Sequence, residues 1–122
     1  MQNILVVDDD PDIVELLKTR LEANNYEVIC ALDGKEGIKK AKEQKPDLII
    51  MDILMPNVSG AEAFKILRAD AATKHIPIIF LTVLTVGIDV TKVNIDGEFY
   101  TSIAKPFKPE KLLSEIEKLI GD

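Results

Sequence analysis

A short apolar run, residues 48–51, ends in a single aspartate and constrains the fold more than any other stretch of this chain. Lys45-Pro46-Asp47 precedes the run, and the turn-forming residues Pro56 and Gly60 follow it. A run this apolar between polar boundaries is typical of a strand buried on both faces, as in a parallel sheet. Asp52 would then lie at the carboxyl end of the strand, where open α/β sheets place their ligands. An aspartate that only begins a turn is the ordinary alternative.

The hydrophobic pattern predicts strands that alternate with helices along the whole chain. Strands are expected at residues 3–7, 26–30, 47–51, 77–81 and 98–103, and helices at 10–23, 35–43, 61–69 and 108–120. Residues 83–97 are rich in β-branched residues and interrupted by glycine, so only a short or distorted helix is expected there. This order indicates an α/β fold: a single doubly wound, five-stranded parallel sheet with helices on both faces.

Composition limits the class of protein. With 122 residues, of which 47% are hydrophobic and 30% charged, the chain has the size and make-up of one globular domain. It has no apolar stretch near the ~20 residues of a membrane span and no signal-peptide pattern, so we expect a cytoplasmic protein without a membrane partner. The single cysteine, Cys30, excludes an internal disulfide and a multi-cysteine metal site. A net charge of −6 argues against direct binding of nucleic acid.

Polar side chains follow four of the five predicted strands. Asp8 and Asp9 come after the first strand, Asp52 after the third, Thr82 after the fourth and Lys105 after the fifth. Each has an ordinary alternative, since aspartates favour helix N-termini and a lysine can be a surface charge. Because parallel strands end at the same edge of a sheet, we expect the five side chains to converge there.

Three carboxylates against one lysine give the predicted site a charge of about −2, which a divalent cation would offset. Oxygen ligands with room for water fit Mg²⁺ better than zinc, which favours histidine or thiolate. The single histidine, His75, precedes the fourth strand and is expected near the opposite edge of the sheet. The sequence therefore predicts a magnesium site held by Asp8 and Asp9.

A carboxylate beside a metal ion, a hydroxyl and a lysine can accept a phosphoryl group as an aspartyl phosphate. Asp52 is the predicted acceptor because it comes from the central strand. Mg²⁺, Lys105 and the Thr82 hydroxyl would each neutralise one phosphoryl oxygen.

These residues resemble the motifs of the response-regulator receiver domains of two-component signalling, including the chemotaxis regulators, over the whole chain. The matching residues are Asp8-Asp9, Asp52 with Met55-Pro56 and Gly60, Thr82, and Lys105-Pro106-Phe107. The resemblance implies one receiver domain over residues 1–122 with a flavodoxin-like strand order of 2-1-3-4-5.

For the site, the resemblance implies that a histidine kinase phosphorylates Asp52. It also implies that Asp9, Asp52 and the backbone carbonyl of Leu54 bind Mg²⁺, with Asp8 assisting largely through water. A cis peptide bond is implied between Lys105 and Pro106, which would aim the lysine into the site. Such a domain accepts a phosphoryl group and promotes its own phosphorylation and dephosphorylation, and it is not a conventional enzyme.

Two departures from the family pattern concern output. Ser102 stands where members usually carry an aromatic switch residue, and Tyr100 shares its predicted strand face, so Thr82, Ser102 and Tyr100 are all candidates for the switch. Val83 is larger than the usual residue at its position and begins the weakly predicted segment 83–97.

We expect a two-state switch whose partners are a histidine kinase or phosphotransfer protein and a downstream target or output domain, with a phosphorylation-dependent homodimer as a further option. The sequence does not separate a stand-alone regulator from a piece of a longer one. Three other readings are an aspartyl-phosphate hydrolase, a flavin-binding domain, and a receiver-fold binding module that switches poorly. The first two lack their motifs in this sequence: the spacing of acids on the first strand and the hydroxyl-rich phosphate loop.

Overall fold

β3 (Leu48–Asp52) lies at the centre of the sheet, and all five of its residues are buried. The structure, a computed structural model, describes residues 1–82, 90–95 and 98–121. The other strands are β1 (Asn3–Val7), β2 (Glu27–Ala31), β4 (Ile78–Thr82), β5 (Val90–Ile95) and β6 (Glu98–Ala104), and the helices are α1 (Pro11–Ala23), α2 (Gly34–Gln44), α3 (Gly60–Ala69) and α4 (Pro109–Ile120).

The sheet has the order β2-β1-β3-β4-β6-β5. Its first five strands are mutually parallel, which confirms the predicted five-stranded parallel sheet and its order, with the predicted fifth strand appearing as β6. β3 pairs with β1 on one side and with β4 on the other. The carboxyl ends of β1, β3, β4 and β6 therefore meet along one edge.

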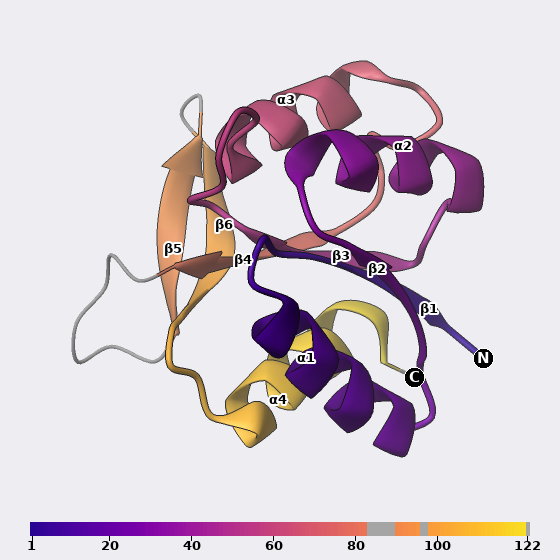
Figure 1. Cartoon of the computed structure of the whole chain (residues 1–122), viewed down its shortest axis with the longest axis vertical. Coiled ribbons are helices and arrows are strands. Elements are labelled where there is room, and N and C mark those ends of the chain that lie inside the picture. Colours follow the sequence, from indigo (N-terminus) through magenta and orange to yellow (C-terminus); the bar gives the residue numbers. More distant parts are fainter. Residues whose placement is uncertain (83–89, 96–97, 122) are drawn as a thin grey trace.

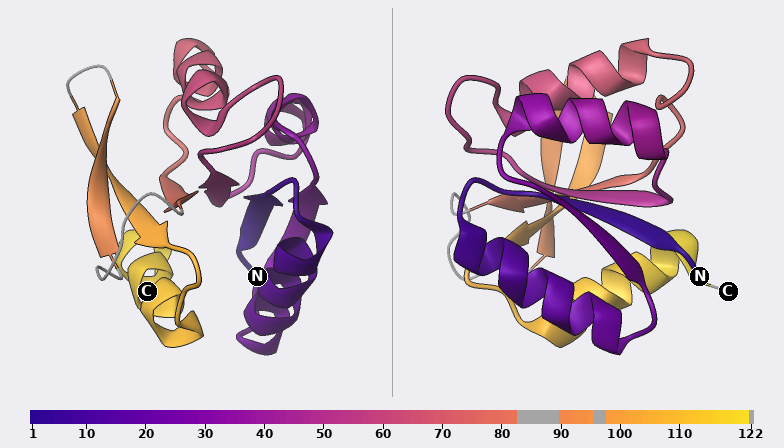
Figure 2. Two further views of the ribbon diagram at one scale, coloured as in Figure 1. Left: turned by 60° about the vertical axis from the view of Figure 1, so that its left-hand side comes forward. Right: turned by 45° about the vertical axis from the view of Figure 1, so that its right-hand side comes forward.

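The expectation of a helix within residues 83–97 is wrong for the part that the structure describes. Residues 90–95 form β5, an edge strand that runs antiparallel to β6 from the pair Val90–Ile103 to the pair Ile95–Glu98 (Figure 2). The β-branched residues of this segment favour a strand, and the neighbouring β6 offers the edge to pair with. The remaining residues of the segment, 83–89 and 96–97, lie outside the described part of the chain, as does the prediction made for Val83.

Helices cover both faces of the sheet, with α1 and α4 on one side and α2 and α3 on the other (Figure 1). Two clusters of buried side chains fill the spaces between the layers. Alternate residues of β3 divide between them, since Ile49 and Met51 pack under α2 and α3 whereas Leu48 and Ile50 pack under α1 and α4. This alternation explains why β3 reads as a continuous apolar run.

Side chains in the loops fix the starts of three helices. Asp10, Asp33 and Ser59 accept hydrogen bonds from the backbone N–H groups of Asp12, Glu36 and Glu62, at the starts of α1, α2 and α3. Each cap stabilises its helix by about 1 kcal/mol. These helices are the next elements after β1, β2 and β3, so their capped ends lie at the same edge of the sheet as Asp52. None of the helices in the described ranges is long and apolar enough to cross a membrane.

Candidate phosphoryl-acceptor and metal site

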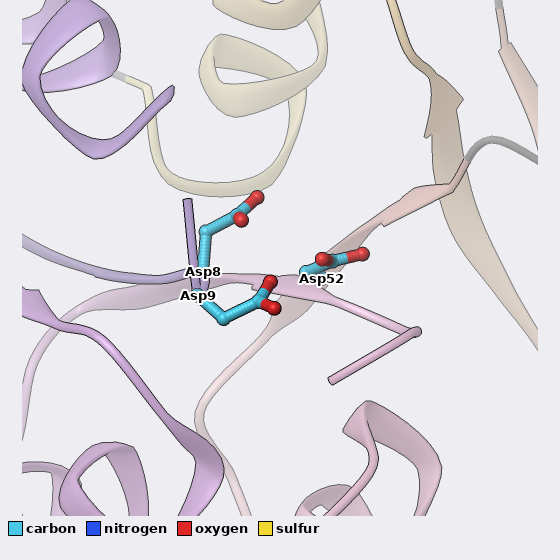
Figure 3. A group of neighbouring side chains, drawn as sticks. All are labelled: Asp8, Asp9 and Asp52. Atoms are coloured by element: carbon cyan, nitrogen blue, oxygen red, sulfur yellow. The ribbon is translucent and has the colours of Figure 1, made fainter. Parts of the chain in front are cut away.

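Three carboxylates gather at the carboxyl edge of the sheet and form what we call the acidic cluster: Asp8, Asp9 and Asp52. Asp8 and Asp9 directly follow β1, and Asp52 is the last residue of the adjacent parallel strand β3. One carboxylate oxygen from each of the three lies within 4.8 Å of the others (Figure 3). Asp8 has no exposed surface and Asp52 is 5% exposed, whereas Asp9 is exposed. The cluster therefore joins two buried charges to one that faces solvent.

Lys105 brings a positive charge to the two buried carboxylates. Its Nζ atom lies 2.7 Å from Asp8 Oδ2 and 3.3 Å from Asp52 Oδ2, and the side chain is 14% exposed. The backbone N–H of Lys105 donates to the carbonyl of Thr82 at 2.7 Å, which holds the residue at the end of β4. The Lys105–Pro106 peptide bond is cis. The structure thus places Lys105 within the acidic cluster.

Backbone N–H groups orient the two buried carboxylates. The N–H of Asp10 donates to Asp8 Oδ1 at 2.9 Å, and the N–H of Leu54 donates to Asp52 Oδ1 at 3.2 Å. In each carboxylate the other oxygen, Oδ2, faces Lys105. Both carboxylates are thereby fixed by main-chain atoms before any ligand is bound.

Burial and neighbouring charges act on the ionisation of the site. Burial raises the pKa of Asp52, the Asp8 charge raises it further, and Lys105 and the Leu54 N–H oppose the rise without cancelling it. For Lys105, burial lowers the pKa, but the carboxylates of Asp8 and Asp52 outweigh burial and leave the pKa raised. The ammonium therefore stays charged near neutral pH, whereas ionisation of Asp52 lowers the free energy of unfolding.

The chemistry of the cluster suits a hard divalent cation. All three side chains offer carboxylate oxygens, the ligands that Mg²⁺ prefers, and the exposed Asp9 leaves one side open to water. Asp8 Oδ2 is buried, and the neighbour that the described ranges give it is the Lys105 ammonium at 2.7 Å. A buried carboxylate oxygen in this state retains lone pairs for a metal or its waters. The residues present therefore fit Mg²⁺.

Thr82 lies beside Asp52 at the same edge. It is the last residue of β4, it is 3% exposed, and the preceding residue, Leu81, pairs with Asp52 across the sheet. The prediction that Thr82 belongs to this edge therefore agrees with its place in the sheet. Of the other predicted residues, Leu54 follows Asp52 and is half exposed, and His75 precedes β4 and so belongs to the opposite edge.

The two residues considered as replacements for the family's switch aromatic both lie on β6. Ser102 is 1% exposed and pairs with Phe80 of β4, and in the described part of the chain its hydroxyl has no hydrogen-bond partner. Tyr100 packs against Phe64 of α3 with ring centroids 4.4 Å apart, and the Arg68 guanidinium lies 5.9 Å from the Tyr100 ring. Tyr100 is thus already packed in an aromatic group under α3.

Sequence reasoning missed the backbone contacts that shape the site. A Cβ atom at Gly60 would lie 2.4 Å from the carbonyl oxygen of Asp52, so only glycine lets α3 begin this close to β3. Gly34 makes a similar approach to Val58. Nothing in the local sequence around Gly34 indicates a contact with the loop after Asp52.

The fold and site define a receiver: a small α/β domain with an acidic cluster and a lysine at the carboxyl edge of its parallel sheet. The response regulator receiver domain model matches residues 4–117. The chain therefore belongs to the response regulator receiver domain family, whose members act in two-component signalling.

Curated relatives carry the same likeness. The chain is 38% identical over 120 residues to the alkaline phosphatase synthesis transcriptional regulatory protein PhoP of Bacillus subtilis, covering 98% of this chain and 48% of PhoP. It is 34% identical over 122 residues to the polar-differentiation response regulator DivK of Brucella anthropi, covering 99% and 98% of the two chains. The DNA-binding response regulator MtrA of Mycolicibacterium smegmatis is 33% identical over 115 residues, which cover 94% of this chain and 49% of MtrA. The chain thus spans about half the length of PhoP and MtrA and nearly all of DivK.

Solved structures agree with the family. The chemotaxis protein CheY4 of Vibrio cholerae superposes with a TM-score of 0.82 at 32% identity, covering 98% of this chain and 99% of CheY4. The receiver domain of the sensor histidine kinase PA1611 from Pseudomonas aeruginosa gives a TM-score of 0.85 at 29% identity, covering 99% and 98%. That second structure has a magnesium ion coordinated in its active site cleft.

Proposed function

We propose that residues 1–122 form one receiver domain that accepts a phosphoryl group on Asp52 from the phosphohistidine of a histidine kinase or phosphotransfer protein. The observation that carries this proposal is the meeting of Asp52 with Asp8, Asp9 and Lys105 at one edge of the sheet. A bond would form between a carboxylate oxygen of Asp52 and phosphorus, while the phosphorus–nitrogen bond of the donor breaks. The electron pair of the broken bond stays on the donor imidazole.

The side chains around Asp52 would divide the remaining work. Asp8, Asp9, Asp52 and the backbone carbonyl of Leu54 would hold Mg²⁺, which when bound supplies charge neutralisation to the phosphoryl oxygens. Lys105 already lies 3.3 Å from Asp52 Oδ2, so its ammonium is placed to contact a second phosphoryl oxygen. The Thr82 hydroxyl, at the end of the neighbouring strand, would donate to a third. We expect phosphoryl acceptance and loss, promoted by the domain itself, rather than conventional enzyme turnover.

Phosphorylation would bias the domain between two states. The phosphoryl group adds about −1.5 to −2 charges beside Thr82 and Lys105, and a change from mostly inactive to mostly active needs several kcal/mol of preference for one state. Thr82 ends β4 and Lys105 directly follows β6, and these two strands pair, with Thr82 opposite Ala104. We propose that the face carrying β6 and α4 passes the change to a downstream target or output domain, or forms a phosphorylation-dependent homodimer.

A second candidate function is a receiver-fold binding module that takes part in signalling but switches weakly. Ser102 offers no ring to move, and Tyr100 is already packed against Phe64 and Phe80, with ring centroids 4.4 and 6.4 Å away. β5 also stands where a helix was expected. These observations favour weak coupling between Asp52 and the output face, although the acceptor chemistry is the same in both proposals.

One experiment tests the acceptor assignment. Incubation of the chain with acetyl phosphate and Mg²⁺ should add one acid-stable, base-labile phosphoryl group, which intact-mass spectrometry detects. Asp52→Asn should abolish the addition, whereas Asp12→Asn, which removes an exposed carboxylate from α1, should leave it unchanged. An unchanged mass for the unmodified chain, or full incorporation in Asp52→Asn, would remove Asp52 as the acceptor.

The cellular setting is also part of the proposal. We propose a cytoplasmic location, where a kinase could reach the domain, and the net charge of −6 disfavours direct contact between this domain and nucleic acid. The relatives include both a chain of nearly the same length and chains of about twice the length, so a stand-alone regulator and a domain of a longer regulator are both consistent with the family. A pull-down with and without beryllofluoride would identify the kinase and the target.

A further inference from the structure

The loop after Asp52, residues 53–59, is held between the first residues of two helices. Gly60 begins α3 and Gly34 begins α2, and both glycines are buried. At Gly60 a Cβ atom would lie 2.4 Å from the Asp52 carbonyl oxygen, and at Gly34 it would lie 2.7 Å from the Val58 carbonyl oxygen. Real Cβ atoms do not approach backbone oxygens this closely, so either helix start would have to move away from the loop if it carried a side chain.

The contact from Gly34 reaches the loop from an element that carries none of the proposed site residues. Beyond the carbonyl oxygen, the same Cβ would lie 3.0 Å from Val58 Cβ and 3.1 Å from Val58 Cγ1. The cap of α2 also fixes the helix start, because the Asp33 side chain accepts from the Glu36 N–H at 2.7 Å. Val58 therefore packs against a backbone surface that is fixed in place.

Backbone hydrogen bonds and a buried side chain restrain the loop, so that it cannot easily accommodate a displacement of Val58. The Val58 N–H donates to the Pro56 carbonyl at 2.8 Å around Asn57, which has a φ of 67°. The Gly60 N–H donates to the Ile53 carbonyl at 2.9 Å and closes the loop at its base. Met55, in the middle, is 8% exposed and belongs to the core under α2 and α3. A displacement of Val58 must therefore reach the first half of the loop.

The first half of the loop carries the atoms that matter for the site. The Leu54 N–H holds Asp52 Oδ1 at 3.2 Å, and the Leu54 carbonyl is a proposed metal ligand. We propose that Gly34 is a positioning residue for this site: by letting α2 pack directly on Val58, it sets where Leu54 and the Asp52 carboxylate lie. The inference rests on the proposed function, because the metal-binding role of Leu54 is part of it. The contact between Gly34 and Val58 can be tested without a metal.

The test compares Gly34→Ala with Ala41→Gly. Both changes are charge-neutral and on α2, and Ala41 is buried in the second half of the helix, away from Gly34. The backbone ¹⁵N resonance of Leu54 is followed first without metal, and the Mg²⁺ dissociation constant is then measured by titration. Urea unfolding of each variant gives the loss of stability against which the loss of affinity is compared.

We expect Gly34→Ala to shift the Leu54 resonance and to weaken Mg²⁺ binding by about tenfold, the range found when groups that orient metal ligands are altered. Ala41→Gly should lower the urea midpoint but leave the Leu54 resonance and the Mg²⁺ affinity close to those of the unmodified chain. Val58→Ala, which removes the Cγ contacts from the loop side, should shift the same resonance to a smaller extent. This second variant serves if Gly34→Ala does not fold.

The outcomes separate the inference from the proposed function. If the Leu54 resonance stays in place in both Gly34→Ala and Val58→Ala, the positioning role is wrong, whatever the metal does. If Ala41→Gly weakens Mg²⁺ binding as much as Gly34→Ala does, the effect is one of helix stability and the inference also fails. If the unmodified chain binds no Mg²⁺ while the Leu54 resonance moves as expected, the contact holds and the proposed metal site fails.

Discussion

The Lys105 ammonium lies 2.7 Å from Asp8 Oδ2, and Asp8 has no exposed surface. A buried carboxylate needs a nearby cation, because the charge cannot be solvated by bulk water. Lys105 thus stabilises the fold, in addition to its proposed contact with a phosphoryl group. The two roles can be measured separately.

Lys105→Ala should lower the free energy of unfolding at pH 7 by about 3 kcal/mol, because it leaves Asp8 and Asp52 buried together without their cation. The variant should still bind Mg²⁺, whose proposed ligands are intact, but it should lose the phosphorylation response. Urea unfolding, Mg²⁺ titration and acetyl phosphate labelling measure the three effects.

Lys118→Ala is the matched control for that change. Lys118 pairs with Glu115 at 2.9 Å on the surface of α4, and its side chain is 69% exposed. Loss of such a pair costs at most about 1 kcal/mol. A Lys105→Ala variant as stable as this control, or one that still responds fully to phosphorylation, would contradict the role given to Lys105.

The raised pKa of Asp52 predicts a pH-dependent effect of Asp52→Asn. Because the pKa is higher in the folded chain than in the unfolded chain, the folded state binds more protons between the two values, and ionised Asp52 destabilises the fold above them. Asp52→Asn should therefore be more stable than the unmodified chain at pH 7. The gain should disappear as the pH falls below the unfolded-state pKa of an ordinary aspartate, where both chains carry a neutral side chain.

Urea unfolding at pH 7 and at successively lower pH values measures this gain. Asp12→Asn is a suitable control, since Asp12 is exposed on the first turn of α1 and no gain is expected there. A loss of stability at pH 7 in Asp52→Asn would show that Lys105 compensates the Asp52 charge more completely than burial and Asp8 oppose it.

The parallel sheet could be predicted because its signal is local. Runs such as residues 3–7 and 48–51 are largely apolar on both faces and end abruptly at aspartates. Their hydrophobic pattern, their length and their boundaries therefore all indicate buried strands. β5 could not be predicted in the same way. Its β-branched residues disfavour a helix, but the strand forms only by pairing with β6. The local sequence does not indicate that the outer edge of β6 is open to an additional strand.

The acidic cluster could be predicted because parallel strands bring their carboxyl ends to one edge, whatever the details of packing. Knowing which residues follow each strand was therefore enough to predict that Asp8, Asp52 and Lys105 lie close together. The contacts made by Gly34 and Gly60 depend instead on the distance between a helix and a loop, which no residue pattern states. In the folded chain, neighbouring backbone atoms leave no room for a Cβ atom at either glycine.

Asp9 differs from the other two aspartates because it is exposed, and this difference predicts its mutant behaviour. Asp9→Ala should change the free energy of unfolding by less than about 0.5 kcal/mol, as is usual for surface positions. It should nevertheless weaken Mg²⁺ binding by about tenfold or more, because a proposed direct ligand is lost. Asp12→Ala removes the same charge from the first turn of α1 and should affect Mg²⁺ binding only slightly. Equal titration curves for Asp9→Ala and the unmodified chain would contradict the assignment of Asp9 as a ligand.

Gly60→Ala should be more damaging than a change at the surface. Its methyl group would meet the Asp52 carbonyl oxygen at 2.4 Å and Ile53 Cα at 2.8 Å, and both are backbone atoms of a buried segment. We expect a loss of about 1–3 kcal/mol in the free energy of unfolding, the usual cost of overpacking. Gly121→Ala is less informative as a control because it sits at the end of α4, so Ala61→Gly, in the first turn of α3, is the better comparison. A Gly60→Ala variant of unchanged stability would show that α3 can shift away from β3 freely.

Tyr100 should remain still when the domain is activated. Its ring is packed against Phe64 at 4.4 Å, and the Arg68 guanidinium lies over the Phe64 ring at 4.7 Å. A movement like that of the family's switch aromatic would have to break this packing, and pairs of aromatic rings contribute about 0.5–1.5 kcal/mol beyond the area they bury.

The composition of the chain makes this prediction measurable. The protein has no tryptophan and two tyrosines, so Tyr26→Phe leaves Tyr100 as the source of tyrosine fluorescence. Addition of beryllofluoride and Mg²⁺, with binding verified by the ¹⁹F signal of bound beryllofluoride, should leave the emission intensity and anisotropy of Tyr100 unchanged. The control is Tyr100→Phe, which retains Tyr26. Tyr26 directly precedes β2 at the opposite edge of the sheet, so its emission reports any general effect of the additives. A clear change in Tyr100 emission that the control lacks would make Tyr100 the moving switch residue and would weigh against the weakly switching binding module.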